Sequence, residues 1–139
     1  MPTLERVAGR PTWLLSRANN RAQSLLAEAF ATEGLRGYHF RVLAALDQYG
    51  AASQADIGRY TGIDRSDVVA TLSDLVERNL AVRRVDGADR RRNIVEITKP
   101  GRAVLARLDT QLDRVQQAVL APLTPSEQAS LVRLLTKLS

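Results

Sequence analysis

The stretch of sequence that decides the fold runs from Ser53 to Asp67 and reads SQADIGRYTGIDRSD. Ser53 can cap a helix, and Asp56 stands three residues later in a variant of the capping box, which more often has Glu or Gln there. Residues 61–63 are a three-residue turn that contains glycine, and Asp64 can cap the helix that follows. Two helices joined in this way form a helix-turn-helix.

The second helix of this pair divides into an apolar stripe and a polar first turn. The apolar residues recur at helical spacing, at Val68, Leu72, Leu75 and Val76. The second helix of a helix-turn-helix lies in the major groove of DNA, with its N-terminal residues nearest the base edges. The candidate base-reading residues are therefore Arg65, Ser66, Asp67, Val69 and Ala70. The competing interpretation is that these are solvated residues at the start of a helix.

Each candidate suits a particular contact with DNA. Arg65 could donate two hydrogen bonds to guanine, and Val69 or Ala70 could contact a thymine methyl group. Ser66 could bond a base or a phosphate, and Asp67 could accept a hydrogen bond from a cytosine amino group. The other DNA contacts that we expect from the helix-turn-helix lie at the start of the preceding helix, at Ser53 and Gln54.

A β-hairpin with an arginine-rich end follows the two helices. Leu80–Val85 is rich in branched residues, Asp86–Asp89 has turn composition, and Asn93–Thr98 places Val95 and Ile97 on one side of a second strand. Five arginines lie between positions 83 and 92, against two aspartates. A hairpin with this charge suits a groove lined by phosphates, whereas the alternative is a solvated run of charges.

Amphipathic helices are predicted on both sides of this region. Apolar residues recur at spacings of three and four over 12–31 and 38–49. A final helix starts at Thr124, where Pro125 and Glu127 complete a capping box. Between the hairpin and this final helix, residues 99–101 open a long helix. It has a narrow apolar seam of coiled-coil type, at Leu105, Leu108, Leu112, Val115 and Val119. This seam needs a partner, either within the chain or in a second copy.

The composition limits what the protein can be. With 139 residues, of which 45% are hydrophobic, the chain is long enough for one domain with its own core. It has no cysteine and one histidine, which excludes disulfides, thiolate zinc sites, thiol redox sensing and histidine-rich metal sites. The net charge of +5, mostly from arginine, makes nucleic acid the leading partner. No membrane span or signal peptide is visible, so we expect a cytoplasmic protein. We also expect no metal and no cofactor.

Several strings resemble the multiple antibiotic resistance regulator (MarR) family. The most specific is DRRRNIVEITKPG at 89–101, which is similar to that family's wing, an Asp-x-Arg motif followed by a strand and a Thr-x-x-Gly helix start. LLSRA at 14–18, SQADI at 53–57 and IDRS at 63–66 add to a resemblance that covers nearly the whole chain. Many members have arginine in the middle of the recognition helix, where this sequence has Val69-Ala70.

The resemblance implies a mainly α fold with a small β-hairpin wing, a winged helix-turn-helix. It implies a single domain over 1–139, with dimerisation helices at 10–34 and 99–139 and a DNA-binding lobe at 36–98. A two-fold dimer would present two recognition helices to two half-sites, hence to a palindrome. The implied dimer interface includes Leu15, Leu108, Leu112, Val115, Leu131, Leu134 and Leu138.

For the wing, the resemblance implies a separate role for each charged residue. Arg91 would enter the minor groove, and Asp89 would hold the wing by pairing with a nearby arginine. Arg90 and Arg92 would contact phosphate.

The resemblance also implies a pocket for a small aromatic or anionic effector between the dimerisation helices and the DNA-binding lobe. The candidates are Trp13, Arg17, Tyr38 and His39, which combine aromatic surface with a cation and a titratable ring. The alternative is that the lone tryptophan and histidine are ordinary core or surface residues.

These observations predict a homodimeric, sequence-specific transcription repressor that a small molecule releases from a palindromic operator. One alternative is a winged-helix module that binds protein rather than specific DNA, because a fold does not determine function. Another is a small enzyme that uses Glu28, Glu33 or Asp47 with His39. No nucleophile motif, phosphate-binding glycine loop or metal-ligand spacing supports this enzyme, so we expect no catalytic activity.

Overall fold

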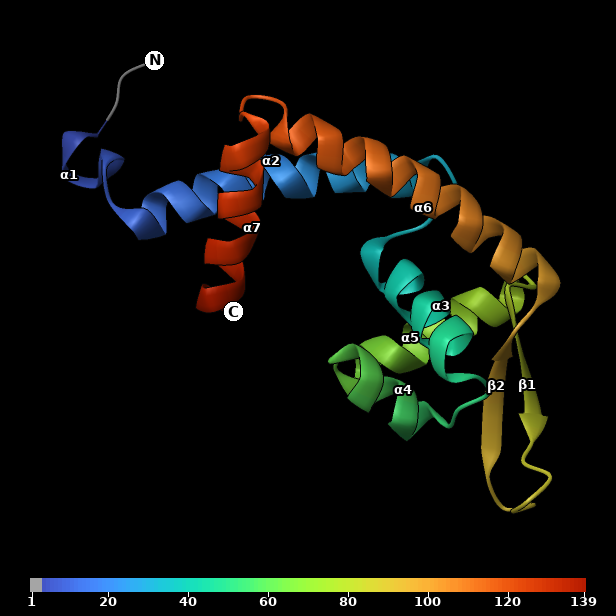
Figure 1. The fold of residues 1–139 in the computed structure, drawn as a ribbon. Coiled ribbons are helices and arrows are strands. Elements are labelled where there is room, and N and C mark those ends of the chain that lie inside the picture. The colour runs from blue at the N-terminus through green and yellow to red at the C-terminus, as the bar shows by residue number, and fades with distance from the viewer. Residues whose placement is uncertain (1–3) are drawn as a thin grey trace. The chain divides into compact units, whose positions relative to one another are not determined.

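The computed structural model describes residues 4–139, within which the chain is mainly helical with one two-stranded hairpin (Figure 1). Residues 1–3 of the predicted 1–139 domain lie outside the described residues. The predicted fold class is confirmed, whereas the four-residue α1 was too short to show any periodicity in the sequence. In chain order the elements are α1 (Glu5–Ala8), α2 (Pro11–Ala31), α3 (Gly37–Tyr49), α4 (Gln54–Thr61), α5 (Arg65–Glu77), β1 (Ala81–Val85), β2 (Asn93–Ile97), α6 (Lys99–Leu120) and α7 (Pro125–Leu138).

The chain divides into two compact units. The central unit is Ala27–Gln111, and the terminal unit combines the described residues up to Leu26 with Leu112–Ser139. The central unit takes in the end of α2 and the first half of α6, where Phe30, Leu105 and Leu108 are buried. The division between the two compact units therefore falls within these two helices.

The core of the central unit lies among α3, α4 and α5, which pack together beside the hairpin (Figure 1). Apolar residues at helical spacing point inward from each helix, and the most deeply buried of them are Val42, Leu43, Leu46, Ile57, Val68, Leu72 and Leu75, while Leu108 of α6 is equally buried. Each side chain of this kind stabilises the fold by roughly 1.5–3 kcal/mol on burial. This packing fixes the angle between α4 and α5, and so the direction of the exposed face of α5.

Local signals start and stop the two helices of the helix-turn-helix as predicted. The Ser53 hydroxyl accepts from the backbone N–H of Asp56 at 3.2 Å, and the Asp56 carboxylate accepts from that of Ser53 at 3.4 Å. α4 ends at Gly62, whose φ of +69° lies in the left-handed region that favours glycine. Asp64 then caps α5 by accepting from the backbone N–H of Ser66 at 3.2 Å.

Two junctions hold the hairpin to the rest of the central unit. β1 pairs antiparallel with β2, and β2 also exchanges two backbone hydrogen bonds of 3.0 and 2.8 Å with Ala52, through Val95. The second junction lies where β2 leads into α6. Here the Thr98 hydroxyl accepts from the backbone N–H of Gly101, and a Cβ on Gly101 would lie 2.1 Å from the Leu80 carbonyl oxygen. The predicted Thr-x-x-Gly helix start thus needs glycine for close packing. Ile94 is buried as well as the two residues predicted to face inward, Val95 and Ile97.

The terminal unit, taken by itself, buries little of its apolar surface. Among its described residues only Val115 is buried. Two hydrogen bonds of 2.9 and 2.6 Å from the Arg21 guanidinium to the carbonyls of Val119 and Ala118 join α2 to the end of α6. The exposed apolar side chains of this unit include Leu14, Leu15, Val132, Leu134, Leu135 and Leu138. No helix in residues 4–139 is long and apolar enough to cross a membrane.

Two residues of the predicted dimer seam have other neighbours in the structure. Leu108 is 0% exposed within a single chain and belongs to the central unit, so its side chain is not available to a second copy. Val115 is also buried within its own chain. Within the chain itself this part of the seam is already buried, while Leu112 and Val119 are half-buried.

Candidate nucleic-acid interface

The outer face of α5 carries the predicted base-reading residues. Val68, Leu72 and Leu75 are buried on the inner face, whereas Arg65 lies in the exposed first turn. The predicted set Arg65, Ser66, Asp67, Val69 and Ala70 is exposed throughout. The helix thus separates the residues that build the core from those that a DNA groove could meet.

The side chains at the start of α5 are not equally free. The Ser66 hydroxyl donates to the Asp64 carboxylate, which also accepts from the Ser66 backbone N–H. These hydrogen bonds from Ser66 hold the pKa of Asp64 below its ordinary value. Within residues 4–139, no hydrogen bond or ion pair engages the Arg65 guanidinium, which is therefore the cation of this turn that remains free for a ligand.

A groove of about 660 Å³ runs beside the start of α5. It brings together three elements that are separate in the sequence, namely the N-terminus of α4, the N-terminus of α5 and the start of β2. Its lining comprises Ser53, Gln54, Ala55, Gly58, Arg59, Ile63, Arg65, Val68 and Asn93. Sequence reasoning missed Arg59 and Asn93, although the position of Arg59 one turn after Asp56 could have indicated an ion pair.

The hairpin arginines differ in what they contact. Arg84 pairs with Glu96 at 2.7 Å, and Arg83 donates to the Ser73 hydroxyl at 3.3 Å. Arg92, for which a phosphate contact remains a prediction, pairs with Asp56 at the start of α4 in this structure. Three of the five hairpin arginines are thus held by the protein's own acceptors.

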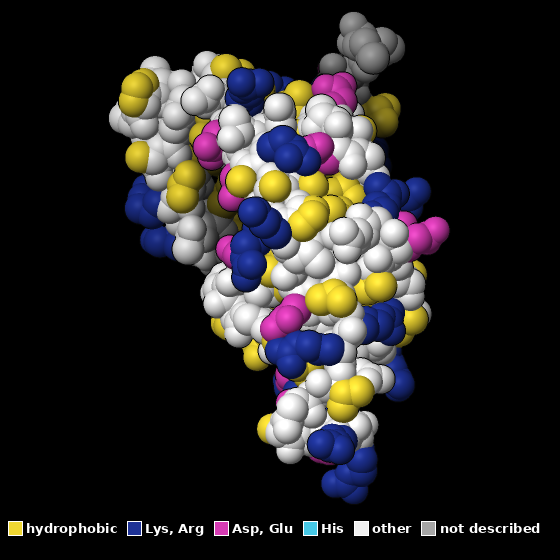
Figure 2. Space-filling view, turned by 90° about the vertical axis from the view of Figure 1, so that its right-hand side faces the viewer, with side chains coloured by type: hydrophobic (Ala, Val, Ile, Leu, Met, Phe, Trp, Pro, Cys, Tyr) yellow, Lys and Arg dark blue, Asp and Glu magenta, His cyan; other side chains and the backbone are white. Residues whose placement is uncertain are grey.

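The end of the hairpin contains the arginines that remain accessible. Asp89 accepts from the backbone N–H of Arg91 at 3.0 Å, and lies 3.5 Å from the Arg91 Nε, a weak pair on a side chain that is 94% exposed. No hydrogen bond or ion pair within the described part of the chain engages the Arg90 side chain. Figure 2 shows Lys and Arg side chains at the lower end of the view, where the hairpin ends.

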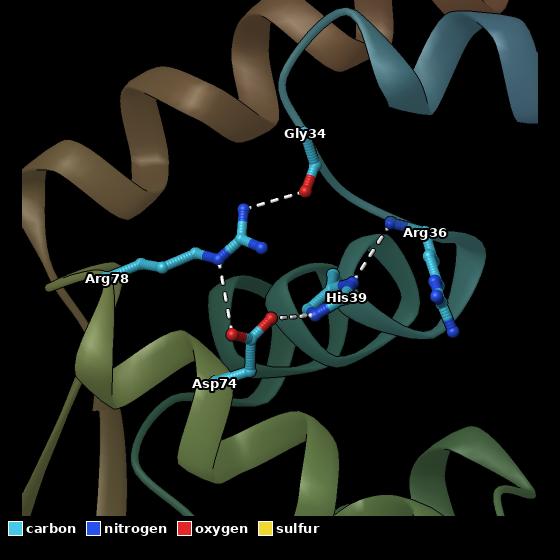
Figure 3. Close-up of polar contacts among 5 residues, drawn as sticks. All are labelled: Gly34, Arg36, His39, Asp74 and Arg78. Carbon is cyan, nitrogen blue, oxygen red and sulfur yellow. Dashed lines mark hydrogen bonds and ion pairs between the residues drawn. The ribbon is translucent and has the colours of Figure 1, made fainter.

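A polar network joins the segment before α3, and His39 of α3, to the C-terminal end of α5 (Figure 3). The His39 Nδ1 accepts from the backbone N–H of Arg36 at 2.9 Å, so the neutral ring donates from Nε2 to Asp74 at 2.6 Å. Arg78 bonds both Asp74, at 3.3 Å, and the Gly34 carbonyl, at 2.7 Å. The buried His39 therefore links the backbone of Arg36 to Asp74, and both of its ring nitrogens are hydrogen-bonded.

The predicted effector residues divide between the two units. Tyr38 and His39 line a cavity of about 530 Å³ in the central unit, together with Arg36, Asp74 and Arg78. Trp13 and Arg17 belong to the terminal unit and are not part of its lining. The cavity wall thus offers an aromatic ring and two guanidinium groups.

Loss of stability in acid is the expected consequence of the Asp74 contacts. Partial burial acts to raise the pKa of Asp74, but hydrogen bonds from His39 and Arg78 and the Arg78 charge keep it below the ordinary 3.8. A depressed carboxyl pKa stabilises the fold at neutral pH, and this contribution is lost as the pH falls below about 4. In chemical denaturation at several pH values, Asp74→Asn should be less stable than the wild type at pH 7. The free energies of unfolding of the two proteins should converge towards pH 3. A difference that stays constant with pH would contradict this origin of the stability.

The carboxylates of the enzyme alternative do not form a catalytic cluster. Glu33 pairs with Arg107, and Asp47 pairs with Arg102 at 3.5 Å. Within residues 4–139, no group of three acidic or histidine side chains could hold a metal ion.

An exposed recognition helix beside a basic hairpin defines a winged-helix protein of the DNA-binding class. The MarR family model matches residues 33–92. The chain is 32% identical, over 77% of its length, to a protein described as a transcriptional regulator for the hcr operon of Thauera aromatica, and spans 64% of that protein. The chain belongs to the MarR family of transcriptional regulators.

Solved structures agree with this assignment over nearly the whole chain. BpsR of Bordetella bronchiseptica is 30% identical with a TM-score of 0.83, and the match covers 99% of this chain and 97% of BpsR. The repressor CouR bound to a 23-mer DNA duplex is 28% identical with a TM-score of 0.87, over 99% and 98% of the two chains. CouR is a transcriptional repressor and the BpsR structure concerns regulation of its DNA binding, whereas what these comparisons show for this chain is a transcriptional regulator of the MarR family.

Proposed function

We propose that the chain is a homodimeric repressor that binds a palindromic operator and is released by a small-molecule effector. The observation that carries DNA binding is the set of exposed cations, with Arg65 on α5 and Arg90 and Arg91 at the end of the hairpin. A helix in the major groove and a basic hairpin on the flanking backbone match the way winged helices contact DNA.

The apolar surface of the terminal unit supports a second copy of the chain as its partner. Leu134 is 47% exposed and Leu138 is 73% exposed, although both lie on the apolar face of α7. Side chains of this kind gain free energy on burial, and two-fold homodimers are the commonest way in which such a face is covered. The residues that we propose for the dimer interface are Leu15, Leu112, Leu131, Leu134 and Leu138.

Selection of bound duplexes from random DNA is the experiment that tests this function. Two recognition helices related by a two-fold axis should enrich inverted half-sites whose centres lie about 10–10.5 base pairs apart, or a multiple of that. Enrichment of a single asymmetric site, or of no sequence at all, would contradict the proposal.

The cavity beside His39 supports an aromatic anion as the effector. The ring of Tyr38 and the guanidinium groups of Arg36 and Arg78 suit an aromatic carboxylate. The structure of BpsR concerns regulation of its DNA binding by 6-hydroxynicotinic acid, a molecule of this class. We propose that a ligand here breaks the contacts of His39 with Asp74, and so changes the position of α5.

The effector proposal predicts a specific loss of response in Arg36→Gln. This change leaves intact the backbone N–H that bonds His39, but it removes a cation from the cavity. We expect 6-hydroxynicotinate to release operator DNA from the wild type, and Arg36→Gln to need about tenfold more, which is the loss typical of one charged hydrogen bond.

Arg102→Gln is the matched control, because this residue of the central unit pairs with Asp47 outside the cavity. It should respond as the wild type does in a fluorescence-anisotropy titration. An equal response of all three proteins, or none, would remove this cavity as the site for such a ligand. Trp13→Phe and Arg17→Gln, assayed in the same way, test whether the terminal unit contributes.

A further inference from the structure

Asp56 is the most heavily shared side chain at the proposed DNA surface. Its carboxylate accepts from the backbone N–H of Ser53 and forms ion pairs with both Arg59 and Arg92. The Asp56 side chain is 17% exposed, whereas the side chains of Arg59 and Arg92 are 69% and 46% exposed. A carboxylate that serves only as a helix cap would not need the two guanidinium groups.

The Arg92 pair is a further attachment of the hairpin to the helix-turn-helix. The others are the backbone bridge between Ala52 and Val95 and the hydrogen bond from Arg83 to Ser73. Arg92 lies three residues from Val95 towards the hairpin end, about 10 Å along an extended chain. Because Arg83 pairs with Val95 in the register, the other two contacts lie at one level of the hairpin, and the Arg92 pair adds an attachment nearer its end that limits how far this end can swing.

The hairpin angle matters because the accessible cations directly precede Arg92. Arg92 also closes the loop, since its carbonyl accepts from the Asp86 backbone N–H at 2.8 Å and its own N–H donates to the Asp89 carbonyl at 3.0 Å. A shift of Arg92 therefore moves Arg90 and Arg91 relative to Arg65 on α5.

We propose that Asp56 is a positioning residue for DNA binding, which holds the hairpin at its working angle through Arg92. Arg92 then serves the geometry of the wing and does not neutralise phosphate. The proposal rests on the DNA-binding function proposed above, and it assigns a contact between α4 and the wing that the helix-turn-helix motif does not itself predict.

The sign of one mutational effect separates this role from simple electrostatics. Asp56→Asn removes a negative charge from a DNA-binding surface, so Coulomb attraction alone would strengthen binding. Loss of the wing angle should instead weaken operator binding by about five- to tenfold, within the range of measured couplings between contacting charged residues. Asp56→Glu keeps the charge and suits a capping box, so it should restore most of the affinity.

Three further variants provide the controls. Ser53→Ala breaks the cap but keeps the Arg92 pair, and Arg59→Gln removes the other guanidinium on the same carboxylate without touching the wing. Arg92→Gln should reproduce Asp56→Asn, and the double variant should be no worse than either single one. Thermal unfolding of each variant identifies any loss that comes from the fold alone.

Two measurements on the full chain complete the test. Without DNA, amide hydrogen exchange in the hairpin should become faster in Asp56→Asn and Arg92→Gln, but not in Ser53→Ala or Arg59→Gln. With operator DNA, the salt dependence of binding should keep its slope in Arg92→Gln, because a lost phosphate contact would lower it by about 0.9.

Tighter binding by Asp56→Asn, or a slope lower by about one in Arg92→Gln, would overturn the proposal. Amide hydrogen exchange in the hairpin that is unchanged in both Asp56→Asn and Arg92→Gln would overturn it as well. If the wild type bound no DNA, the proposed function would fail, whereas the exchange data would still decide whether Asp56 anchors the wing.

Discussion

Leu134→Glu should dissociate the protein into monomers and abolish operator binding. Leu134 lies with Leu123 and Leu131 along a shallow apolar groove of the terminal unit. In the proposed dimer this groove is covered, and a carboxylate buried there without a partner costs several kcal/mol. About 3 kcal/mol corresponds to a more than hundredfold weaker dimer. A monomer bound to one half-site then lacks the DNA contacts that the second subunit would make on the other half-site.

Ala129→Glu is the matched control for this change. It introduces the same charge on the same helix, at an exposed position that the helical repeat places opposite Leu134 and Leu138. Sedimentation should give twice 15.3 kDa for the wild type and Ala129→Glu, and 15.3 kDa for Leu134→Glu. A well-folded wild-type monomer at micromolar concentration would contradict the dimer.

Arg65→Ala and Arg91→Ala should both impair DNA binding, but in different ways. Arg65 is the free cation in the first turn of α5, where a bidentate contact with guanine is worth about 1–3 kcal/mol of discrimination at one base pair. Its loss should relax the preference at that position in each half-site more than it weakens non-specific binding. Arg91 is 94% exposed at the end of the hairpin, where it can meet phosphates or a narrow groove. Its loss should weaken binding to many sequences alike and lower the salt slope.

A panel of operators with single-base changes, measured at two salt concentrations, distinguishes these results. If Arg65→Ala weakens every operator equally, while Arg91→Ala changes the preference at one base pair, the roles of helix and wing are reversed. Arg83→Ala is a useful reference, because that arginine of β1 donates to Ser73 rather than standing free.

The local parts of the structure could be read from the sequence. The caps at Ser53, Asp64 and Thr124 lie where predicted, because a capping hydrogen bond joins residues only two or three apart. The helix-turn-helix and the hairpin followed from these caps and from the spacing of apolar residues. The exposed face of α5 followed from the same spacing, since residues of one stripe are buried together.

The contacts between distant segments could not be read in this way. Asp56 pairs with Arg92 across 36 positions, and His39 bonds Asp74 across 35. No sequence periodicity selects among the many arginines and carboxylates that could have met. Leu108 shows the same limit for apolar residues, because a seam predicts that a face is buried but not which part of the fold covers it.

In the function proposed here, two copies of this chain bind one palindromic operator. The most direct test is the mass of the complex with a selected duplex, measured by sedimentation at a protein concentration well above the dissociation constant. The mass should exceed that of the duplex by twice 15.3 kDa, and a duplex cut to one half-site should lose the tight complex. A complex with a single chain, of equal affinity on the whole and the half operator, would contradict the account.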